Sequence, residues 1–283
     1  LRIWERRCQQ AGARMIVHPL PSPLESPQQV VDTLVSAMTD RTRLLVFSHV
    51  TSPTALVFPA EALVAAARSR GVAVAIDGPH AVAMLPLNLG TLQPDYYTAS
   101  CHKWLSAPFG SGFLYVHPRR QASLQSPVRS WGRPHLGHEP SWRDEFEWLG
   151  TRDPAAMLAI ADAIAFPGRL TQVSADAPPE EAWERFRRYA HGVVRQVRCD
   201  YLSRYGQPSL TSDDESWFGT MAAMPLPPGD APSLQQALWQ RYRVEVPIVA
   251  WGGRRLLRVS WHLYNEPEHL QRLDGALREL LDG

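Results

Sequence analysis

Short apolar runs alternate with helical segments along the first half of the chain, and this alternation constrains the fold most. The predicted strands cover residues 44–49, 72–77, 95–100 and 112–117. Residues 44–49 form a continuous apolar run, which is typical of a strand buried on both faces of a sheet. Residues 27–38, before the first of these strands, and residues 59–70, before the second, are expected to be helical, and Gly71 suits the end of the second helix. The pattern predicts an α/β fold with a mostly parallel sheet and helices on both faces.

The rest of the chain predicts a second, smaller domain. A further strand is expected at residues 14–20, and a loop-rich stretch covers residues 125–153. The later segments are expected in the order helix 154–166, linker 171–179, helix 180–205, strand 218–224, helix 233–242, strand 256–261 and helix 267–281. We therefore expect a large domain over residues 1–170 and a small C-terminal α+β domain over residues 171–283.

Charge and composition exclude several classes of function. The net charge of +1 does not provide the excess of positive charge that is typical of nucleic-acid-binding proteins. No apolar run approaches the length of a membrane span, and no signal peptide is visible. Cys8, Cys101 and Cys199 are too few and too scattered for a disulfide framework, which predicts a reducing, cytoplasmic compartment. The chain opens without methionine inside a segment with helical character, so we expect the natural protein to begin earlier.

The single lysine, Lys103, stands out because the chain otherwise uses arginine for its long cationic side chains. Lysine and arginine together number 29, and 28 of them are arginine. A lysine amine can lose its proton when it is desolvated and then form a Schiff base, whereas a guanidinium cannot. The alternative is a surface lysine without a function. The neighbours of Lys103 favour the chemical role.

Polar side chains follow three of the predicted strands. The segments are residues 48–52 (SHVTS), 77–80 (DGPH) and 100–103 (SCHK). In open α/β sheets, ligands bind at the carboxyl ends of the strands. An acid, several hydroxyls, imidazoles and the lysine are therefore expected to converge at one edge of the sheet. An Asp-Gly pair such as Asp77-Gly78 is, by itself, more often a plain turn. The prediction therefore depends on the order and spacing of all three polar segments.

These segments resemble a known family. Residues 48–53 (SHVTSP), 75–81 (AIDGPHA) and 95–116 (DYYTASCHKWLSAPFGSGFLYV) are similar to the class V aminotransferases, which are fold-type I enzymes that use pyridoxal 5′-phosphate (PLP). The CHKWL sequence resembles the isopenicillin N epimerase-like branch. Residues 150–154 (GTRDP) and 258–265 (RVSWHLYN) resemble further motifs of the family, so the likeness extends over essentially the whole chain.

The resemblance implies roles for the matching residues. Lys103 would form the Schiff base with PLP, and Asp77 would pair with the pyridine nitrogen so that the ring accepts electrons from a substrate carbanion. His80 would contact the phenolic oxygen, with Ser52 a weaker candidate. Ser100 and His102 would bind the phosphate, and Thr151 would reach the phosphate of the partner subunit, which implies a homodimer. Arg258 would hold the α-carboxylate of a small amino-acid-like substrate.

The sequence departs from the family pattern in two respects, and each leads to an expectation about function. Family members have a further segment before the point that matches Leu1, with another phosphate-binding loop and a residue that stacks on the cofactor ring. Without these groups we expect weak PLP binding and a partly formed site. Cysteine desulfurases carry a nucleophilic cysteine shortly before the carboxylate-binding arginine, and residues 201–258 hold none. A persulfide-forming desulfurase is therefore not expected.

Two hypotheses about function remain open from the residues. The first is a PLP enzyme acting at Cα by epimerisation, transamination or β-elimination such as C–S cleavage. The second is a non-catalytic or truncated homologue that keeps the fold and binds PLP poorly. The sequence does not select the substrate. No metal site is predicted, because the His135 and His138 pair and the neighbouring Glu139 lie in a Pro/Gly-rich loop and not on a helix.

Overall fold

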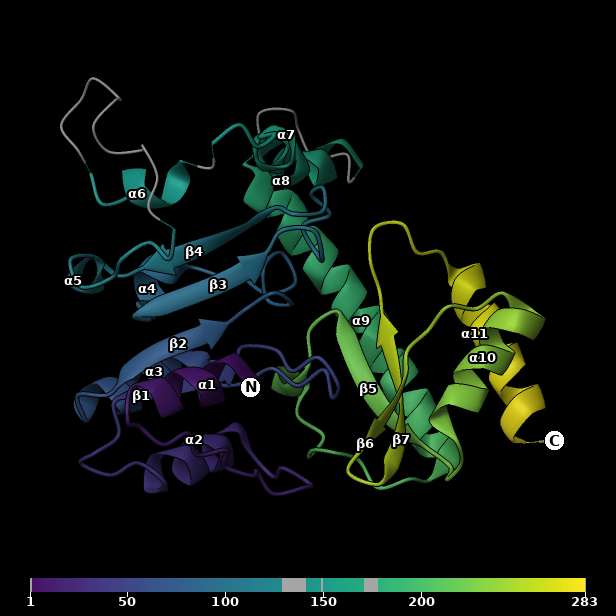
Figure 1. The fold of residues 1–283 in the computed structure, drawn as a ribbon. Helices are drawn as coiled ribbons and strands as arrows, with labels where there is room; N and C mark the ends of the chain where they lie inside the picture. The colour runs from purple at the N-terminus through teal and green to yellow at the C-terminus, as the bar shows by residue number, and fades with distance from the viewer. Residues whose placement is uncertain (1, 129–140, 149, 171–177, 283) are drawn as a thin grey trace.

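The large sheet is mixed, with its first three strands parallel. The computed structural model describes residues 2–128, 141–148, 150–170 and 178–282. The strands are β1 (Leu44–Ser48), β2 (Ala73–Asp77), β3 (Tyr96–Ser100) and β4 (Gly112–Val116), in the order β1-β2-β3-β4. Only β4 runs antiparallel to its neighbour. Ser48 pairs with Asp77, and Asp77 pairs with Thr98, so the three parallel strands end at one edge of the sheet (Figure 1).

Helices α2 (Pro27–Ser36) and α3 (Ala60–Ser69) form where the sequence predicts them. Ser26 caps α2 by accepting a hydrogen bond from the Gln29 N–H. Helix α3 buries Ala60, Leu63, Val64 and Ala67, which recur at helical spacing and form an apolar stripe. Gly71 follows its end with a φ of +68°, a conformation that costs glycine little. The shorter helices near this sheet are α1 (Arg2–Gln10), α4 (Leu89–Leu92) and α5 (Pro118–Gln121).

A second, antiparallel sheet lies beside the large one. The long helix α9 (Pro179–Tyr205) packs on β5 of this second sheet (Figure 1). The second sheet has the order β5-β7-β6 and consists of β5 (Met221–Leu226), β6 (Ile248–Trp251) and β7 (Arg254–Ser260). Helices α10 (Ala231–Tyr242) and α11 (Pro267–Leu281) lie beside it. A single 3₁₀ turn, Glu215–Trp217, precedes β5.

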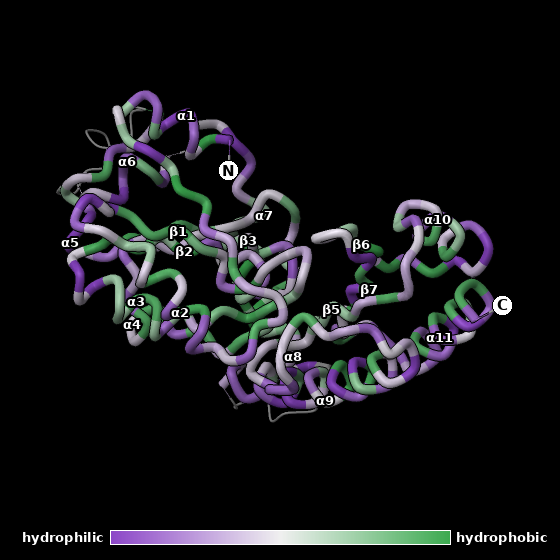
Figure 2. The backbone as a smooth tube through the Cα atoms, turned by 90° about the horizontal axis from the view of Figure 1, so that it is seen from below, coloured by the Kyte–Doolittle hydropathy of each residue, from purple (hydrophilic) through white to green (hydrophobic). Residues whose placement is uncertain are grey.

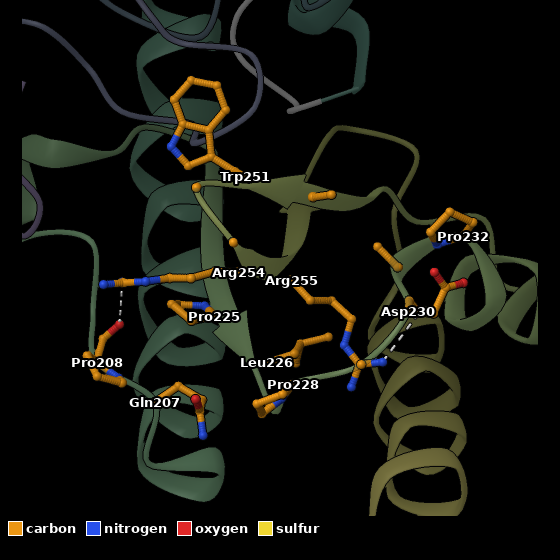
Figure 3. A pocket seen from close by; sticks show the side chains of 15 residues that line it. Gln207, Pro208, Pro225, Leu226, Pro228, Asp230, Pro232, Trp251, Arg254 and Arg255 are labelled. Carbon is orange, nitrogen blue, oxygen red and sulfur yellow. Dashed lines mark hydrogen bonds between the residues drawn. The ribbon is translucent and has the colours of Figure 1, made fainter. Parts of the chain in front are cut away.

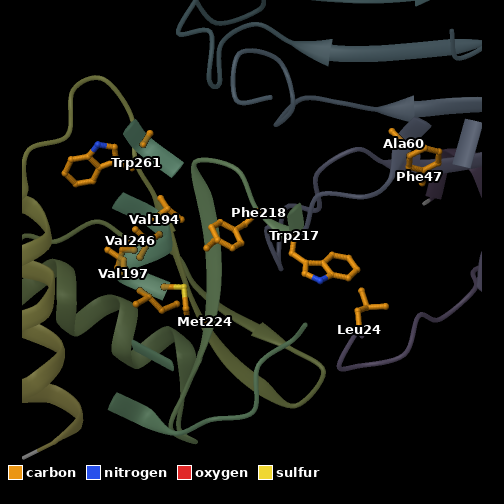
Figure 4. Close-up of a cluster of buried hydrophobic side chains, with 14 of the residues drawn as sticks. Leu24, Phe47, Ala60, Val194, Val197, Trp217, Phe218, Met224, Val246 and Trp261 are labelled. Carbon is orange, nitrogen blue, oxygen red and sulfur yellow. The ribbon is translucent and has the colours of Figure 1, made fainter. Parts of the chain in front are cut away.

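One hydrophobic cluster extends through both halves of the molecule. In Figure 4, Val194 and Val197 of α9 lie with Phe218, Met224, Val246 and Trp261, while Trp217 approaches Leu24. Figure 2 shows apolar residues concentrated along the strands and on one side of the long helices. Burial of this apolar surface is the main favourable term for folding. Among the residues that the structure describes, no helix has the length and apolar character needed to cross a membrane.

Several predicted elements differ from the observed ones. Residues 14–20 form no strand, and Ile16 and Val17 are exposed, because no described strand pairs with them. Strand β6 was not predicted, and the strand expected at 218–224 begins three residues later as β5. The helix expected at 154–166 is divided into α7 (Ala155–Leu158) and α8 (Ile160–Leu170), and the predicted loop contains the short helix α6 (Asp144–Glu147). Most of the predicted linker, residues 171–177, lies outside the described residues.

Candidate active site

The polar segments predicted to converge do so at the carboxyl ends of β1, β2 and β3. Because the strands are parallel and in register, the segments that follow Ser48, Asp77 and Ser100 leave the sheet at the same edge. This is the edge where α/β folds bind ligands. The three segments therefore converge at one edge of the sheet, as the sequence predicts.

Lys103 lies beside His80 at this edge. Its Nζ is 3.2 Å from His80 Nε2. Although the Lys103 side chain is exposed, partial desolvation of its amine lowers its pKa, Asp77 opposes that change and Arg258 reinforces it. Burial lowers the pKa of His80 to about 4, and the positive charges of Lys103 and Arg258 act in the same direction. Near neutral pH the site therefore pairs an amine of weakened basicity with a neutral imidazole.

Trp104 fixes the other side of the His80 ring. It is 6% exposed, and its indole Nε1 donates a hydrogen bond of 3.3 Å to His80 Nδ1. Its backbone carbonyl accepts a hydrogen bond of 2.8 Å from His262 Nε2. Sequence reasoning placed Trp104 and His262 inside two family-like motifs but gave neither a role, because a buried aromatic next to a functional residue normally indicates packing.

Arg258 reaches the site from the second sheet. Its Nη1 donates hydrogen bonds to the backbone oxygen of Ser52 at 2.5 Å and to the Ser52 hydroxyl at 3.1 Å. Its Nε is buried and has no hydrogen-bond partner in the described part of the chain. Burial lowers the pKa of the guanidinium, but Arg258 remains a cation at any physiological pH. The structure thus brings together Ser52 and Arg258, which the sequence places far apart.

Asp77 ends β2 with an exposed side chain on the opposite face from its buried neighbour Ile76. The following residue is a glycine for a steric reason: a Cβ on Gly78 would lie 2.1 Å from the Tyr97 hydroxyl oxygen. That hydroxyl is 3.0 Å from His49 Nδ1, so the Tyr97 and His49 side chains fill the space beneath the turn. Burial raises the pKa of Tyr97, and the negative charge of Asp77 adds to the effect. The hydroxyl therefore stays protonated under the Asp77-Gly78 turn.

Ser100 and His102 are both half-buried beside Lys103. His102 Nδ1 is buried without a hydrogen-bond partner among the described residues, and the His102 ring lies 5.2 Å from that of Phe109. A buried ring nitrogen without a partner is costly unless a ligand or water satisfies it. Its position between Ser100 and Lys103 is suited to an anionic group that accepts hydrogen bonds.

Thr151 is exposed and makes no hydrogen bond with the other predicted site residues in the described part of the chain. The neighbouring Arg152 approaches Gly110, in the loop that follows Lys103. The structure therefore places the turn at Thr151 near this loop without bringing Thr151 to Lys103.

Within the described ranges there is no group of three His, Cys, Asp or Glu side chains that could hold a metal ion, and His135, His138 and Glu139 lie outside those ranges.

A separate cavity lies away from the strand-end site. It has a volume of about 470 Å³ and is located at the end of the second sheet, between Pro208, Trp251 and the buried Arg255 (Figure 3). Arg254 donates to the Pro208 oxygen on one side, and Arg255 donates to the Asp230 oxygen on the other. None of the predicted site residues lines this cavity. Chemistry rather than cavity size therefore identifies the strand-end site.

The α/β fold carries a single lysine among the polar groups at its strand ends, and comparison with known proteins places the chain in a family of enzymes. The family model described as "Aminotransferase class-V" matches residues 1–176. The chain is 39% identical to an isopenicillin N epimerase of Amycolatopsis lactamdurans over 298 residues, covering 98% of this chain and 70% of that protein. It is 35% identical to the isopenicillin N epimerase of Streptomyces clavuligerus, with the same coverage. The chain belongs to the class V aminotransferase family of PLP-dependent enzymes.

More distant relatives extend the range of chemistry. A putative L-cysteine desulfhydrase of Oryza sativa subsp. japonica is 27% identical over 96% of this chain and 61% of that protein. Among solved structures, the apo cysteine desulfurase of Thermococcus onnurineus superposes with a TM-score of 0.78 at 18% identity, over 100% of this chain and 70% of that one. At that identity the likeness shows the fold alone. The predicted family and the α/β fold of fold-type I are both confirmed.

Proposed function

We propose that this chain acts at Cα of an amino acid or an amino-acid-derived substrate, with Lys103 as the covalent attachment point of PLP. The observation that carries the proposal is the 3.2 Å approach of the Lys103 amine to His80 at the strand-end edge. An amine must be uncharged to react with a carbonyl compound, and the lowered pKa of Lys103 supports that state. Membership of a PLP-dependent family supports the identity of the cofactor.

The groups around Lys103 fit this cofactor. Asp77 is an acceptor suited to a protonated ring nitrogen, and His80 and, more weakly, Ser52 are suited to the phenolic oxygen. Ser100 and the unpartnered His102 ring would bind the phosphate. When bound, PLP supplies an electron sink for negative charge that develops at Cα.

The chain's own residues would bind the substrate and move its proton. Arg258 uses Nη1 for Ser52, while its Nε and Nη2 edge makes no hydrogen bond with the described residues. That edge is suited to donate hydrogen bonds to both oxygens of an α-carboxylate in a bidentate pair. The Lys103 amine lies on the same edge of the sheet and would take or return the Cα proton.

The relatives help to order the possible reactions. Two isopenicillin N epimerases at 39% and 35% identity support testing epimerisation first. The cysteine desulfhydrases, at lower identity, support C–S cleavage as the next candidate, and transamination is the third. Persulfide chemistry is not proposed, because residues 201–258 contain no cysteine and Cys199 lies on α9.

Three further proposals concern organisation. We propose a large domain over residues 1–170 and a small one over residues 171–283, which the two separate sheets support.

We propose a homodimer in which Thr151 of each copy reaches the phosphate site of the other, and the exposure of Thr151 supports this. We propose a cytoplasmic location, since Cys8, Cys101 and Cys199 form no disulfide.

One observation favours the second hypothesis, a non-catalytic or truncated homologue, on the substrate side. The Nη1 group of Arg258 already donates to Ser52, so part of the guanidinium that would bind the substrate carboxylate is occupied within the chain. Absorbance spectra with increasing PLP separate the hypotheses, because covalent attachment to Lys103 produces a visible band and a non-binding homologue shows only free PLP. Amino acids are then incubated with the loaded protein in D₂O. Exchange of the Cα hydrogen supports the proposal, and the product (the other enantiomer, a 2-oxo acid or sulfide) identifies the reaction.

A further inference from the structure

Trp104 is held at both ends by histidines from different parts of the chain. Its indole donates to His80 Nδ1, and its carbonyl accepts from His262 Nε2. The His262 ring is packed between Phe186, at 5.2 Å, and Tyr264, at 4.6 Å. The position of the indole is therefore determined by buried contacts rather than by solvent.

These hydrogen bonds decide which nitrogen of His80 carries the proton. An indole N–H is a donor and never an acceptor, so His80 Nδ1 must accept. The single proton of the neutral His80 ring is then on Nε2, which faces Lys103 Nζ at 3.2 Å. An N–H at Nε2 cannot pair with an ammonium group, because both are donors. It can donate to the lone pair of an uncharged amine.

We infer that Trp104 is a positioning residue that sets the tautomer of His80 and thereby favours the uncharged form of the Lys103 amine over the ammonium. The tautomer and the state of Lys103 belong to the cofactor-free protein. Only the consequence, a lysine ready to attach to a carbonyl compound, rests on the proposed function.

The charges that face His80 agree with this arrangement. Burial is the main cause that lowers the pKa of His80 to about 4, and the positive charge of Arg258, together with that of Lys103 whenever its amine is protonated, acts in the same direction. His80 is therefore neutral across the physiological range, where the choice of tautomer matters. Asp77 favours the charged form of Lys103 and so opposes the effect, while Arg258 favours the uncharged form.

The test uses the fact that Lys103 is the only lysine. Protein labelled with ¹³C at the lysine ε-carbon gives one side-chain NMR signal, and its pH titration reports the Lys103 pKa without any cofactor. We expect a pKa below the ordinary value of about 10.4 in the wild type. Trp104→Phe should raise it by about 0.5 to 1 pH unit, because one hydrogen bond of ordinary strength is lost.

Trp217→Phe is the matched control. It removes a different buried indole hydrogen bond, from Trp217 Nε1 to the Ser212 hydroxyl at 3.1 Å, and should leave the Lys103 titration unchanged. An equal pKa in the wild type and Trp104→Phe, or an equal rise in Trp217→Phe, overturns the inference.

If Trp104→Phe does not fold, the wild type still tests the idea. In ¹⁵N-histidine spectra, with the His80 signals assigned by their loss in His80→Gln, Nε2 must be protonated and Nδ1 unprotonated at neutral pH. A proton on Nδ1 would overturn the inference. The outcome is independent of the proposed function: normal tautomer and pKa results with no attachment of PLP would contradict the function and leave the role of Trp104 standing.

Discussion

Arg258 Nη1 donates to both the backbone oxygen and the hydroxyl of Ser52, two residues separated by 206 positions in the chain. This contact links β7 of the small sheet to the segment that follows β1 of the large one. It places a guanidinium at the strand-end site, where its charge also affects His80 and Lys103.

Arg258→Lys should raise KM steeply for amino-acid substrates and leave PLP binding almost unchanged. An ammonium cannot form the two parallel hydrogen bonds that a guanidinium offers a carboxylate. Steady-state kinetics and a PLP titration of the same preparation check this. Ser52→Ala serves as the control, because it removes only the hydroxyl acceptor and keeps Arg258 and the backbone bond. An unchanged KM in Arg258→Lys would transfer carboxylate binding to another arginine, with Arg152 or Arg254 next to test.

Lys103 should carry the cofactor covalently. After PLP is added and borohydride is applied, mass spectrometry should find the modification on the peptide that contains Lys103. Lys103→Arg keeps the positive charge and removes the last lysine, so the adduct should disappear. A covalent adduct that survives in Lys103→Arg would contradict the assignment. The same titration measures affinity and tests the prediction of weak PLP binding.

Asp77→Asn should keep the fold and PLP attachment but lower turnover by several orders of magnitude. A carboxylate at this position favours protonation of the ring nitrogen, and an amide of the same shape does not. Absorbance spectra, circular dichroism and turnover measured on one preparation separate these effects. Turnover close to that of the wild type would show that another group controls the ring nitrogen.

Asp95 should stabilise the large sheet through its charge. Burial alone would raise the pKa of Asp95, but hydrogen bonds from Arg119, Arg120 and the Val74 N–H outweigh burial and lower it to about 2. Since the unfolded value is about 3.9, the folded state prefers the ionised form by about 2–3 kcal/mol. This contribution is complete above about pH 4 and is lost as the pH falls toward 2.

Urea unfolding at pH 7 and pH 3 checks that prediction. Asp95→Asn should unfold at lower urea concentration at pH 7, with a smaller difference from the wild type at pH 3. Asp200→Asn, on the exposed side of α9, should match the wild type at both values. Equal losses for Asp95→Asn at the two pH values would mean that its packing, and not its charge, stabilises the sheet.

Much of the fold and of the site could be predicted from the sequence by itself, because the necessary signals are local. The segments at 44–49, 72–77 and 95–100 indicated strands, and parallel strands bring their carboxyl ends to one edge. The convergence of the segments that hold Asp77, His80 and Lys103 could therefore be predicted without coordinates. The unique lysine indicated a candidate for the reactive group, since the chain uses arginine for its other long cationic side chains.

The tertiary structure decided the features that depend on partners distant in the sequence. Residues 14–20 have the composition of a strand but find no partner, whereas β6 forms because β7 offers it a ladder of hydrogen bonds. The Trp104 contacts with His80 and His262, and the Arg258 contact with Ser52, join segments that no spacing rule connects. Periodicity reports which face of an element is buried, but only packing determines which donor meets which acceptor.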